Sequence, residues 1–590
     1  VGNAASYGII PAPESLMPRP GKFTLDNRTS LQVETDDEEF ARAAEVFIDR
    51  VRTASGLDIV GKNKKRKGII LRKVEGLGPE EYRLKVSPED IVAEAATPAG
   101  AFYSLQTLLQ LLPPEIYSSK KITGIKWTIP CCEISDKPAF SYRGMMLDCG
   151  RHFYPKEFVK KFIDQMSILK LNMFHWHLTE DQGWRIEIKK YPLLTEVGSK
   201  RPYTADYDDK NPDGKPHEGF YTQEDIKEIV DYAALRHVTV VPEIEIPGHS
   251  TAALAAYPAL SCDSTKTYKV STCWGIKEDV YCPSEFTFRF LEDVFTEMLP
   301  LFPSRYWHIG GDECPQKAWK ESAFCRNLMK QKGLKSYDEI QSLFVNRVSS
   351  FLRSHGKTVI GWDEILDGGN VDGMVAQSYR GHAPAAKGIR RGHYVILSPD
   401  RWCYYNYYQA DPETEPKANS LLLTLKKAYN YYPVVDSLPE LSKKYIIGAE
   451  GCVWGEFIPD VNSAEYWTFP RMAAMSEVGW TERQNKDWQS FRVRMEKEMK
   501  RLEASEIACS KVYWNVIFDY DSINLPRPVD ADLMLEYPYA AIHYTTDGTD
   551  PTPDSPVFSR RFTPGKGVIV KAQGFTHDGR PVGKPTSKRF

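Results

Sequence analysis

The sequence predicts an α/β fold, a (β/α)8 TIM barrel with an N-terminal α+β accessory domain and a small C-terminal β-sandwich. Between about residues 140 and 485, eight short apolar runs alternate with amphipathic helical patterns, as in a closed barrel of parallel strands. The region before them mixes β-like and helical patterns, and the region after them is rich in Pro, Gly, Thr and Asp. We therefore expect domains at 1–138, 139–508 and 509–590.

The first region contains both kinds of local pattern. Residues 67–74 (KGIILRKV) and 80–87 (EEYRLKVS) are β-like, and residues 38–52 and 99–112 carry apolar side chains at helical spacing. A proline-bounded stretch, 130–138, ends this region. The pattern predicts an α+β domain.

The barrel region supplies one strand candidate for each position of an eight-stranded sheet. The candidates begin at Tyr142, Leu171, Val238, Arg305, Thr358, Gly373, Tyr394 and Tyr445. Helical stripes lie between them, and one of these helices opens with Ser336 and Glu339 at the spacing of a capping box. A doubly wound sheet is the alternative, but no Gly-rich phosphate loop follows the first strand. A charged helix, about 486–508, is expected to pack on the outside of the barrel.

Composition limits the classes of partner. The chain has 590 residues, 42% of them apolar and 26% charged, which indicates several globular domains. Its formal net charge of -3 gives no general attraction to nucleic acid or to an anionic membrane, and no apolar run is long enough for a membrane span. The aromatic content of 12% suits stacking on flat apolar ligand faces such as sugar rings, although large cores use aromatics too. The oligomeric state stays open.

Cysteine usage and the first residues bear on the compartment. Eleven cysteines are irregularly spaced, and their odd number leaves at least one thiol free. Residues 1–10 (VGNAASYGII) lack a basic start followed by an apolar run, so any secretory signal is expected to be removed already or never to have existed. We expect a periplasmic or extracellular location.

Acidic and aromatic residues gather where the predicted strands end, which is where a barrel of this kind builds its active site. A single acid at such a place is often a helix N-cap, and we expect Asp148, Asp363 and Glu243 to be structural. The recurrence at nearly all eight ends indicates a mouth for a polyhydroxylated, flat-faced ligand. The residues concerned include Arg143, Glu180, His249, Asp312, Glu313, Trp362, Tyr379, Tyr404, Asn406, Trp454 and Glu456.

The string WHIGGDEC, residues 307–314, places Asp312 and Glu313 side by side. Neighbouring side chains at a strand end point in different directions, so these two acids are poorly placed to act as an opposed acid and nucleophile pair. His175 and His177 raise a zinc alternative, but a third ligand is not evident from the sequence. We expect a metal-independent site with no cofactor. A Ser-His-Asp arrangement is not indicated, because the pattern G-x-S-x-G is absent.

Five motifs in order, YRGMMLDCGRHF, FHWHLTEDQGWR, IPGHS, HIGGDE and IGWDEI, resemble the family 20 glycoside hydrolases, the β-N-acetylhexosaminidases. The resemblance covers nearly the whole chain. It implies an exo-acting enzyme that removes terminal β-linked N-acetylglucosamine or N-acetylgalactosamine with retention. In this family the acetamido oxygen of the substrate attacks the anomeric carbon and forms an oxazolinium intermediate, so no protein nucleophile is required.

The resemblance also implies roles for individual residues. Glu313 would be the general acid and base, Asp312 would hold the acetamido NH, and His249 with Glu180 would orient and tune the general acid. Substrate-binding roles are implied for Arg143, Trp362, Tyr379, Tyr404, Asn406, Trp454 and Glu456. The chain departs from the common pattern in having Glu180 before Asp181, in having Tyr379 where Trp is frequent, and in having Asn406 where Asp is frequent. An uncharged Asn406 would tolerate an anionic group at the 6-position of the sugar.

Two rival functions remain at this stage. One is a catalytically inactive carbohydrate-binding protein that keeps the pocket without turnover. The other is a retaining glycosidase with its own carboxylate nucleophile, which would accept sugars that lack the 2-acetamido group.

Overall fold

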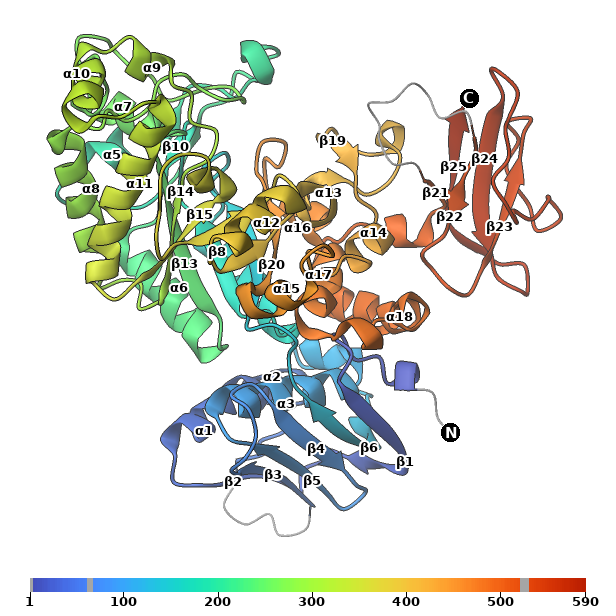
Figure 1. The fold of residues 1–590 in the computed structure, drawn as a ribbon. Helices are drawn as coiled ribbons and strands as arrows, with labels where there is room; N and C mark the ends of the chain where they lie inside the picture. The colour runs from blue at the N-terminus through green and yellow to red at the C-terminus, as the bar shows by residue number, and fades with distance from the viewer. Residues whose placement is uncertain (1–3, 61–66, 520–529) are drawn as a thin grey trace.

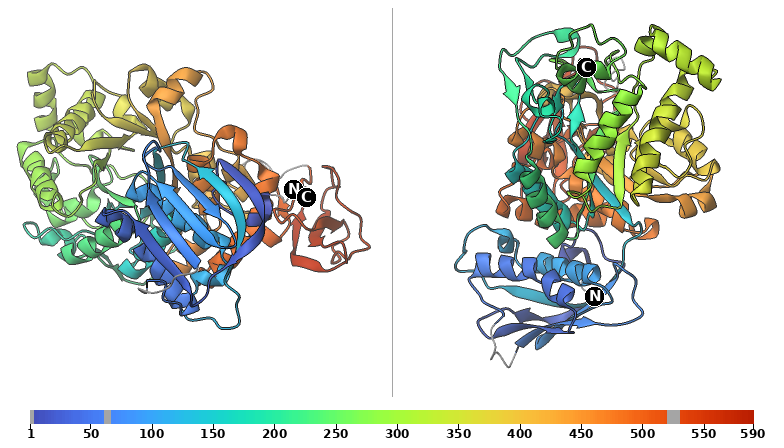
Figure 2. Two further views of the ribbon diagram at one scale, coloured as in Figure 1. Left: turned by 90° about the horizontal axis from the view of Figure 1, so that it is seen from below. Right: turned by 90° about the vertical axis from the view of Figure 1, so that its left-hand side faces the viewer.

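The computed structural model describes residues 4–60, 67–519 and 530–590, which form three parts in chain order (Figure 1). The amino-terminal part lies against one end of a central barrel, and the carboxyl-terminal strands form a module at its side (Figure 2). One large apolar core belongs to the barrel and its helices, a second to the amino-terminal part and a small third to the module. The predicted fold class is confirmed.

The amino-terminal part is a six-stranded sheet in the order β1-β6-β4-β5-β3-β2. Its helices lie between the sheet and the barrel (Figures 1 and 2). The helix expected over 38–52 is divided at Ala44, whose N–H bonds to the carbonyl of Ala41, 3.1 Å away, and so tightens the turn. The strands are β1 (Ser15–Thr24), β2 (Thr29–Glu34), β3 (Lys67–Lys73), β4 (Tyr82–Val86), β5 (Asp90–Ala95) and β6 (Thr128–Asp136), and the helices are α1 (Glu38–Ala43), α2 (Glu45–Ser55) and α3 (Pro98–Leu111).

The barrel closes through eight parallel strands in the order β13-β14-β15-β16-β17-β20-β7-β8. All eight predicted strands are present, and each begins within a few residues of its predicted start. They are β7 (Tyr142–Asp148), β8 (Met173–His177), β13 (Thr239–Ile246), β14 (Tyr306–Gly310), β15 (Thr358–Trp362), β16 (Val375–Ser378), β17 (Val395–Leu397) and β20 (Ile446–Val453).

Helices surround the barrel and bury their apolar faces against it. The expected capping box at Ser336 does not form: the residue is the N-cap, but its side chain makes no capping hydrogen bond. Glu339 instead accepts from the N–H of Lys335 at 2.5 Å. The larger helices are α4 (Lys156–Ile168), α6 (Gln223–Leu235), α8 (Glu285–Met298), α11 (Tyr337–Ser354), α12 (His382–Arg390), α15 (Pro439–Tyr445), α16 (Val461–Thr468), α17 (Arg471–Trp480) and α18 (Trp488–Ala504).

Helix α18 packs on the outside of the barrel, as expected: Phe491, Met495 and Met499 belong to the barrel core. The module after it is a three-stranded sheet, β23 (Ala541–Thr545), β24 (Ile569–Phe575) and β25 (Pro581–Arg589), next to the two-stranded β21 (Ile517–Phe518) and β22 (Leu533–Met534). Side chains from both sheets share one small core. None of the helices in the described part of the chain has the length and apolar character needed to cross a bilayer.

The loops that follow the barrel strands at their carboxyl ends carry extra elements and so build a deep mouth. These elements are α5 (Leu193–Glu196), η3 (Tyr207–Asp209), α7 (Thr251–Ala256), η4 (Pro258–Leu260), α9 (Lys317–Lys320), α10 (Ala323–Lys332), η5 (Asp363–Leu366), α13 (Asp400–Cys403), β19 (Asn419–Leu422) and α14 (Leu425–Tyr429).

Candidate active site

A pocket of about 290 Å³ opens at the carboxyl ends of the barrel strands. Eight of the residues predicted for the site line it: Asp312, Glu313, Trp362, Tyr379, Tyr404, Asn406, Trp454 and Glu456. Five further lining residues were not predicted for the site: Arg151, Tyr207, Asp400, Tyr407 and Asn419. The pocket therefore joins most of the predicted set, which comes from loops far apart in the sequence.

Two glycines let the chain turn into the acidic pair. Gly310 has φ 74° and Gly311 has φ 95°, values that favour glycine. A β-carbon on Gly310 would lie 2.2 Å from a carboxylate oxygen of Glu245, so the strand end and that acid approach closely only with glycine here. Glu313 itself has φ 44°, an uncommon conformation for a residue with a side chain and one that is frequent at functional sites.

One histidine faces both acids of the pair. The Nε2 atom of His249 lies 3.4 Å from Glu313 Oε1 and 3.7 Å from Asp312 Oδ2. On the other side of the ring, Nδ1 lies 2.9 Å from Asp181 Oδ2 and 3.1 Å from Glu180 Oε2. The predicted contact with Glu180 is present, and Asp181 shares it at a shorter distance. The imidazole therefore connects two acids behind the pocket to two acids within it.

Buried charges determine the protonation of this group. Burial opposes the charged form of His249, but the surrounding carboxylates, Glu180 foremost, raise its pKa well above the usual value. Burial would raise the pKa of Glu313, yet its contact with His249 lowers it. For Asp312, burial outweighs the effect of His249 and raises the pKa to about 6. We infer a protonated imidazole opposite two acids that differ in their affinity for protons.

Two more acids, Glu245 and Glu364, support the pair from outside. Burial and the neighbouring Asp312 raise the pKa of Glu245 well above its usual value, and they raise that of Glu364 to about 8. Both effects favour the protonated form of these acids. Glu245 accepts the N–H of Gly311 at 3.2 Å, and Glu364 accepts the N–H of Glu313 at 2.9 Å. These bonds fix the backbone on both sides of Asp312.

Four aromatic side chains form the walls of the pocket. The ring centroids of Trp362 and Trp454 are 5.5 Å apart, and those of Trp362 and Tyr379 are also 5.5 Å apart at 82°. Tyr404 lies parallel to Tyr379 at 6.4 Å and contacts Trp454 at 6.0 Å. Each ring stands on a different strand-end loop, so the walls form only when the barrel closes. Such a box suits a small apolar group attached to a polar ring.

The prediction that Arg143 holds the sugar is wrong. Arg143 is the second residue of β7, so it lies at the amino end of the barrel, away from the pocket. Its buried guanidinium bonds to Glu80 at 2.6 Å and to the hydroxyl of Tyr103 at 3.0 Å, both in the amino-terminal domain. Because Arg143 stands near the start of the predicted strand, the direction of that strand already places it at the opposite end of the barrel from the active site.

The arginine in the pocket is Arg151, eight residues further along the same motif. Its Nη1 atom lies 3.1 Å from Asp148, 3.2 Å from Glu180 and 3.4 Å from Glu456. Its guanidinium carbon is 5.3 Å from the centre of the Trp454 ring. Three acids and an aromatic face thus hold the side chain at the pocket wall, where it can donate to hydroxyl groups.

Buried polar atoms at the rim lack partners within the described residues. Both amide atoms of Asn406 and the Oε2 atom of Glu456 have no hydrogen bond from this part of the chain. Buried polar groups are normally paired, so these atoms indicate where a polar ligand binds. Asp400 accepts the hydroxyl of Tyr407 at 3.0 Å and so fixes that ring at the same rim.

The three acids expected to be structural hold the scaffold. Asp148 accepts the N–H groups of Gly150 and Gly455, Asp363 accepts the N–H of Tyr379, and Glu243 contacts His175.

The zinc alternative concerned histidines that lie deep in the barrel. His175 places Nδ1 2.8 Å from Glu450 and Nε2 2.5 Å from Glu243, so carboxylates already contact both ring nitrogens. Several groups of His and acid side chains here are close enough to hold an ion, including His175 with Glu243 and His308. Because hydrogen bonds within the network account for the ring nitrogens of His175, metal independence stays our prediction.

Comparison with known proteins agrees with this geometry. The family model for the catalytic domain of glycosyl hydrolase family 20 matches residues 140–483, the model for domain 2 of that family matches 6–137, and the Fn3 associated model matches 533–582. A β-hexosaminidase of Porphyromonas gingivalis is 41% identical over 84% of this chain and 63% of its own length, so the chain spans less than two thirds of that relative. A β-hexosaminidase of Vibrio furnissii is 34% identical over 81% of this chain and 77% of its own.

Solved structures give the same result. The exo β-N-acetylglucosaminidase of Vibrio harveyi, in complex with N-acetylglucosamine, has a TM-score of 0.76 and 33% identity over 85% of this chain and 78% of its own. The N-acetyl-β-hexosaminidase of Streptomyces plicatus, in complex with Thio-NAglucal, has a TM-score of 0.74 and 31% identity over 88% and 98% of the two chains.

Proposed function

The chain belongs to glycosyl hydrolase family 20, and on that premise we propose that it is an exo-acting β-N-acetylhexosaminidase. It would remove a terminal non-reducing β-linked N-acetylglucosamine or N-acetylgalactosamine from an oligosaccharide or glycoconjugate. The named activities of its relatives support this reaction class. The pocket, about 290 Å³, lies at the small end of ligand sites, which supports binding of one terminal sugar.

The observation that carries the proposal is the contact of one histidine nitrogen with two adjacent acids beneath an aromatic box. Asp312 and Glu313 line one pocket and both face His249 Nε2, at 3.7 Å and 3.4 Å, so they approach one ligand from the same side rather than from opposite faces. A two-carboxylate mechanism needs opposed groups. A mechanism in which the substrate supplies the nucleophile needs only one proton donor and one acceptor for the acetamido NH, which these two residues provide.

In the proposed first step the acetamido oxygen of the sugar attacks the anomeric carbon as the glycosidic bond breaks. Glu313 gives its proton to the leaving oxygen, and Asp312 accepts a hydrogen bond from the acetamido NH and offsets the positive charge of the oxazolinium ring. In the second step Glu313 takes a proton from water, whose oxygen attacks the same carbon and opens the ring. Two displacements at one carbon leave its configuration unchanged.

The proton for the first step comes from the His249 and Glu313 pair. In the open pocket the pair exists as an ion pair, because His249 holds its proton strongly. Binding of a sugar expels water, which disfavours separated charges and moves the proton toward Glu313. Asp181 and Glu180 keep the imidazole in place during both steps.

Paired aryl β-glycosides with and without the 2-acetamido group test the proposal. We expect turnover only of the 2-acetamido compounds. Equal turnover of both would favour the glycosidase with its own carboxylate nucleophile, and binding without any turnover would favour the inactive binding protein. The same set in gluco, galacto and 6-sulfated versions would define the sugar preference.

The proposal includes a periplasmic or extracellular location, since polymeric glycans and surface glycoconjugates lie outside the cytoplasm. Fractionation of the producing cells, followed by assay of each fraction with the aryl N-acetylglucosaminide, tests it. Activity confined to the cytoplasmic fraction would contradict it.

A further inference from the structure

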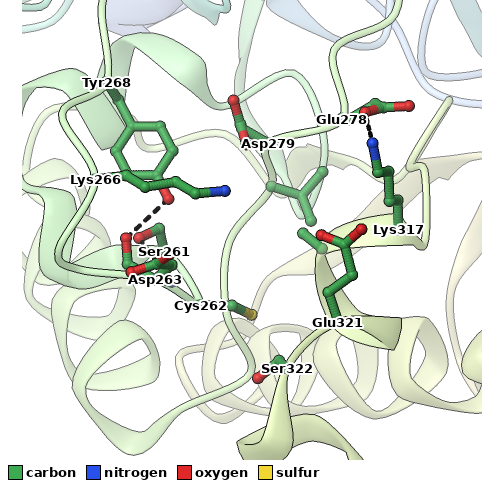
Figure 3. Close-up of a pocket in the computed structure, with 12 residues that line it drawn as sticks. Ser261, Cys262, Asp263, Lys266, Tyr268, Glu278, Asp279, Lys317, Glu321 and Ser322 are labelled. Atoms are coloured by element: carbon green, nitrogen blue, oxygen red, sulfur yellow. Dashed lines mark hydrogen bonds and ion pairs between the residues drawn. The ribbon is translucent and has the colours of Figure 1, made fainter.

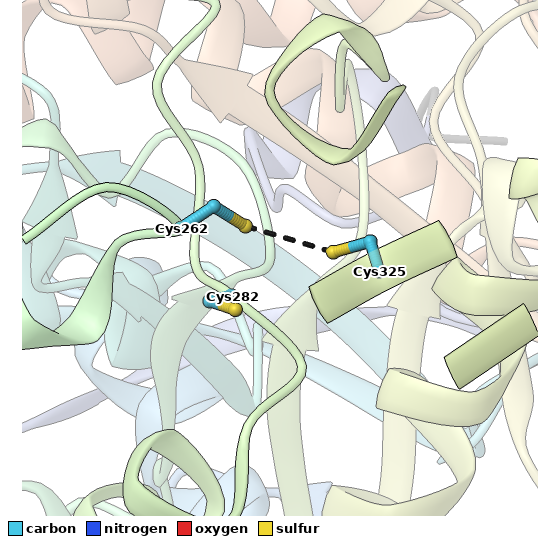
Figure 4. Close-up of side chains that lie close together, drawn as sticks. All are labelled: Cys262, Cys282 and Cys325. Carbon is cyan, nitrogen blue, oxygen red and sulfur yellow. Dashed lines mark hydrogen bonds between the residues drawn. The ribbon is translucent and has the colours of Figure 1, made fainter. Parts of the chain in front are cut away.

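Three cysteines outside the sugar pocket lie close together. Cys262 follows η4, Cys282 stands just before α8, and Cys325 lies in the first turn of α10. Their sulfur atoms all lie within 4.8 Å of one another, and those of Cys262 and Cys325 are 3.7 Å apart (Figure 4).

The separation of the sulfur atoms matches a metal site better than a disulfide. A disulfide joins two sulfur atoms at about 2.05 Å. Two thiolates on a tetrahedral zinc ion, each about 2.3 Å from the metal, lie about 3.8 Å apart. The 3.7 Å between Cys262 and Cys325 therefore corresponds to one edge of such a tetrahedron. The sulfur atom of Cys282 lies within 4.8 Å of both, so the three thiols can supply one face of it.

The surroundings leave a fourth position open. Cys262 and Ser322 line a separate pocket of about 250 Å³, and Figure 3 shows the carboxylates of Asp263, Asp279 and Glu321 around the cysteine. Because Cys262 lines this pocket, water can reach an ion held by the sulfur atoms. A site with three protein ligands and one open position is a common zinc arrangement.

The charges near the cluster are mixed, because two lysines and four carboxylates line its pocket and an arginine follows Cys325. Three thiolates and one Zn²⁺ have a net charge of −1, and a charge of that sign is stabilised by basic side chains in a partly buried place. Lys266 and Lys317 line the same pocket, and Arg326 follows Cys325 directly. Lys317 also pairs with Glu278 at 3.1 Å, which keeps it at the rim.

The cluster connects the loops that carry the active-site residues. Cys262 and Cys282 belong to the connection after β13, which also holds His249, and Cys325 belongs to the connection after β14, which holds Glu313. Together with Trp319, two of these cysteines lie in a small apolar core of their own under these loops. A link between the two connections would therefore restrain the relative position of His249 and Glu313.

We propose that Cys262, Cys282 and Cys325 bind one Zn²⁺ ion, with water as the fourth ligand, and that this ion holds together the loops after β13 and β14. It is distinct from the sugar site and takes no part in bond cleavage. Binding deprotonates thiols, so it releases protons and weakens as the pH falls.

Metal analysis of the intact, reduced protein tests the proposal. After treatment with a thiol reductant and addition of Zn²⁺, we expect about one ion per chain, and Co²⁺ should give the sulfur-to-metal charge-transfer absorption of thiolate ligands. Cys282→Ser and Cys325→Ser should each reduce occupancy to about a tenth or less. Cys509→Ser, which removes a half-buried thiol elsewhere, is the matched control and should bind as the unaltered chain does.

Two results would overturn the proposal. One is a reduced, folded and active wild-type protein that shows no thiolate absorption with Co²⁺ and holds no Zn²⁺ after gel filtration. The other is peptide mass spectrometry of protein purified without reductant that finds two of the three cysteines joined as a disulfide. Both measurements are made on the wild-type protein, so a variant that fails to fold does not affect the outcome.

Discussion

Replacing His249 with Gln should move the acid limb of the enzyme's pH profile to higher pH. The imidazolium nitrogen lies 3.4 Å from Glu313 and 3.7 Å from Asp312. At an effective dielectric constant of about 20, unit charges at these distances attract by about 4–5 kcal/mol. Glu313 is 38% exposed, and water in the pocket screens much of this energy. We therefore expect the pKa of each acid to rise by about 1–2 units.

The direction of the shift follows from the roles of the two acids. Activity needs Asp312 ionised, so the acid limb follows its pKa, which is raised to about 6 before the replacement. Loss of the positive charge makes Asp312 harder to ionise, so the acid limb moves upward. The basic limb follows loss of the proton that His249 and Glu313 share. In the unaltered enzyme His249 holds this proton at a raised pKa, whereas in the variant only Glu313 can hold it, so the basic limb moves downward and the active pH range narrows.

The assay is kcat/KM for an aryl β-N-acetylglucosaminide as a function of pH. Exposed His355, replaced by Gln, serves as the control and should leave the profile unchanged. A lower rate with both limbs at their original pH would refute the reasoning, because it would show that His249 contributes no charge to the pair.

Three further replacements test other parts of the account. Glu245→Gln keeps a neutral side chain of the same shape and should retain most of kcat, whereas Glu245→Ala should lose at least about tenfold through the unpaired Gly311 N–H and Asp312; equal loss in both would exclude a neutral Glu245. Arg151→Met should weaken sugar binding and lower kcat/KM by about 10²-fold, and an unchanged kcat/KM would remove Arg151 from the sugar site. Arg143→Met should leave KM unchanged but destabilise the protein by about 3 kcal/mol, because it removes the ion-pair partner of the partly buried Glu80. Thermal unfolding measures the loss of stability. A raised KM with no change in the melting temperature would contradict the assignment.

The sequence predicted the parts of the fold that depend on local pattern. All eight barrel strands are short apolar runs, and a strand that is buried on both faces has this apolar pattern at any position in the barrel. The helix at 38–52 was predicted as continuous because Phe40, Ala44, Phe47 and Val51 lie on one helical face, yet the chain tightens at Ala44. Helical periodicity runs unchanged through this position and does not report the break.

The site was predictable where a residue stands directly after a strand. Asp312, Trp362 and Trp454 follow or end their strands, so their arrival in one pocket follows from the closed barrel. Arg143 shows the limit of motif resemblance without direction: it lies in the correct motif but at the start of the strand. Tyr207 and Asn419 stand far from the end of any barrel strand, in connections that reach the pocket only through their own folding. Periodicity carries no signal for them.

The central claim is that the acetamido oxygen of the sugar, and not a side chain, displaces the leaving group. Rates of kcat/KM for aryl glycosides whose acetamido methyl carries an increasing number of fluorine atoms test it most directly, because fluorine withdraws electrons from that oxygen. The account predicts a steep fall in kcat/KM with each added fluorine. A rate that stays constant across the series would contradict it.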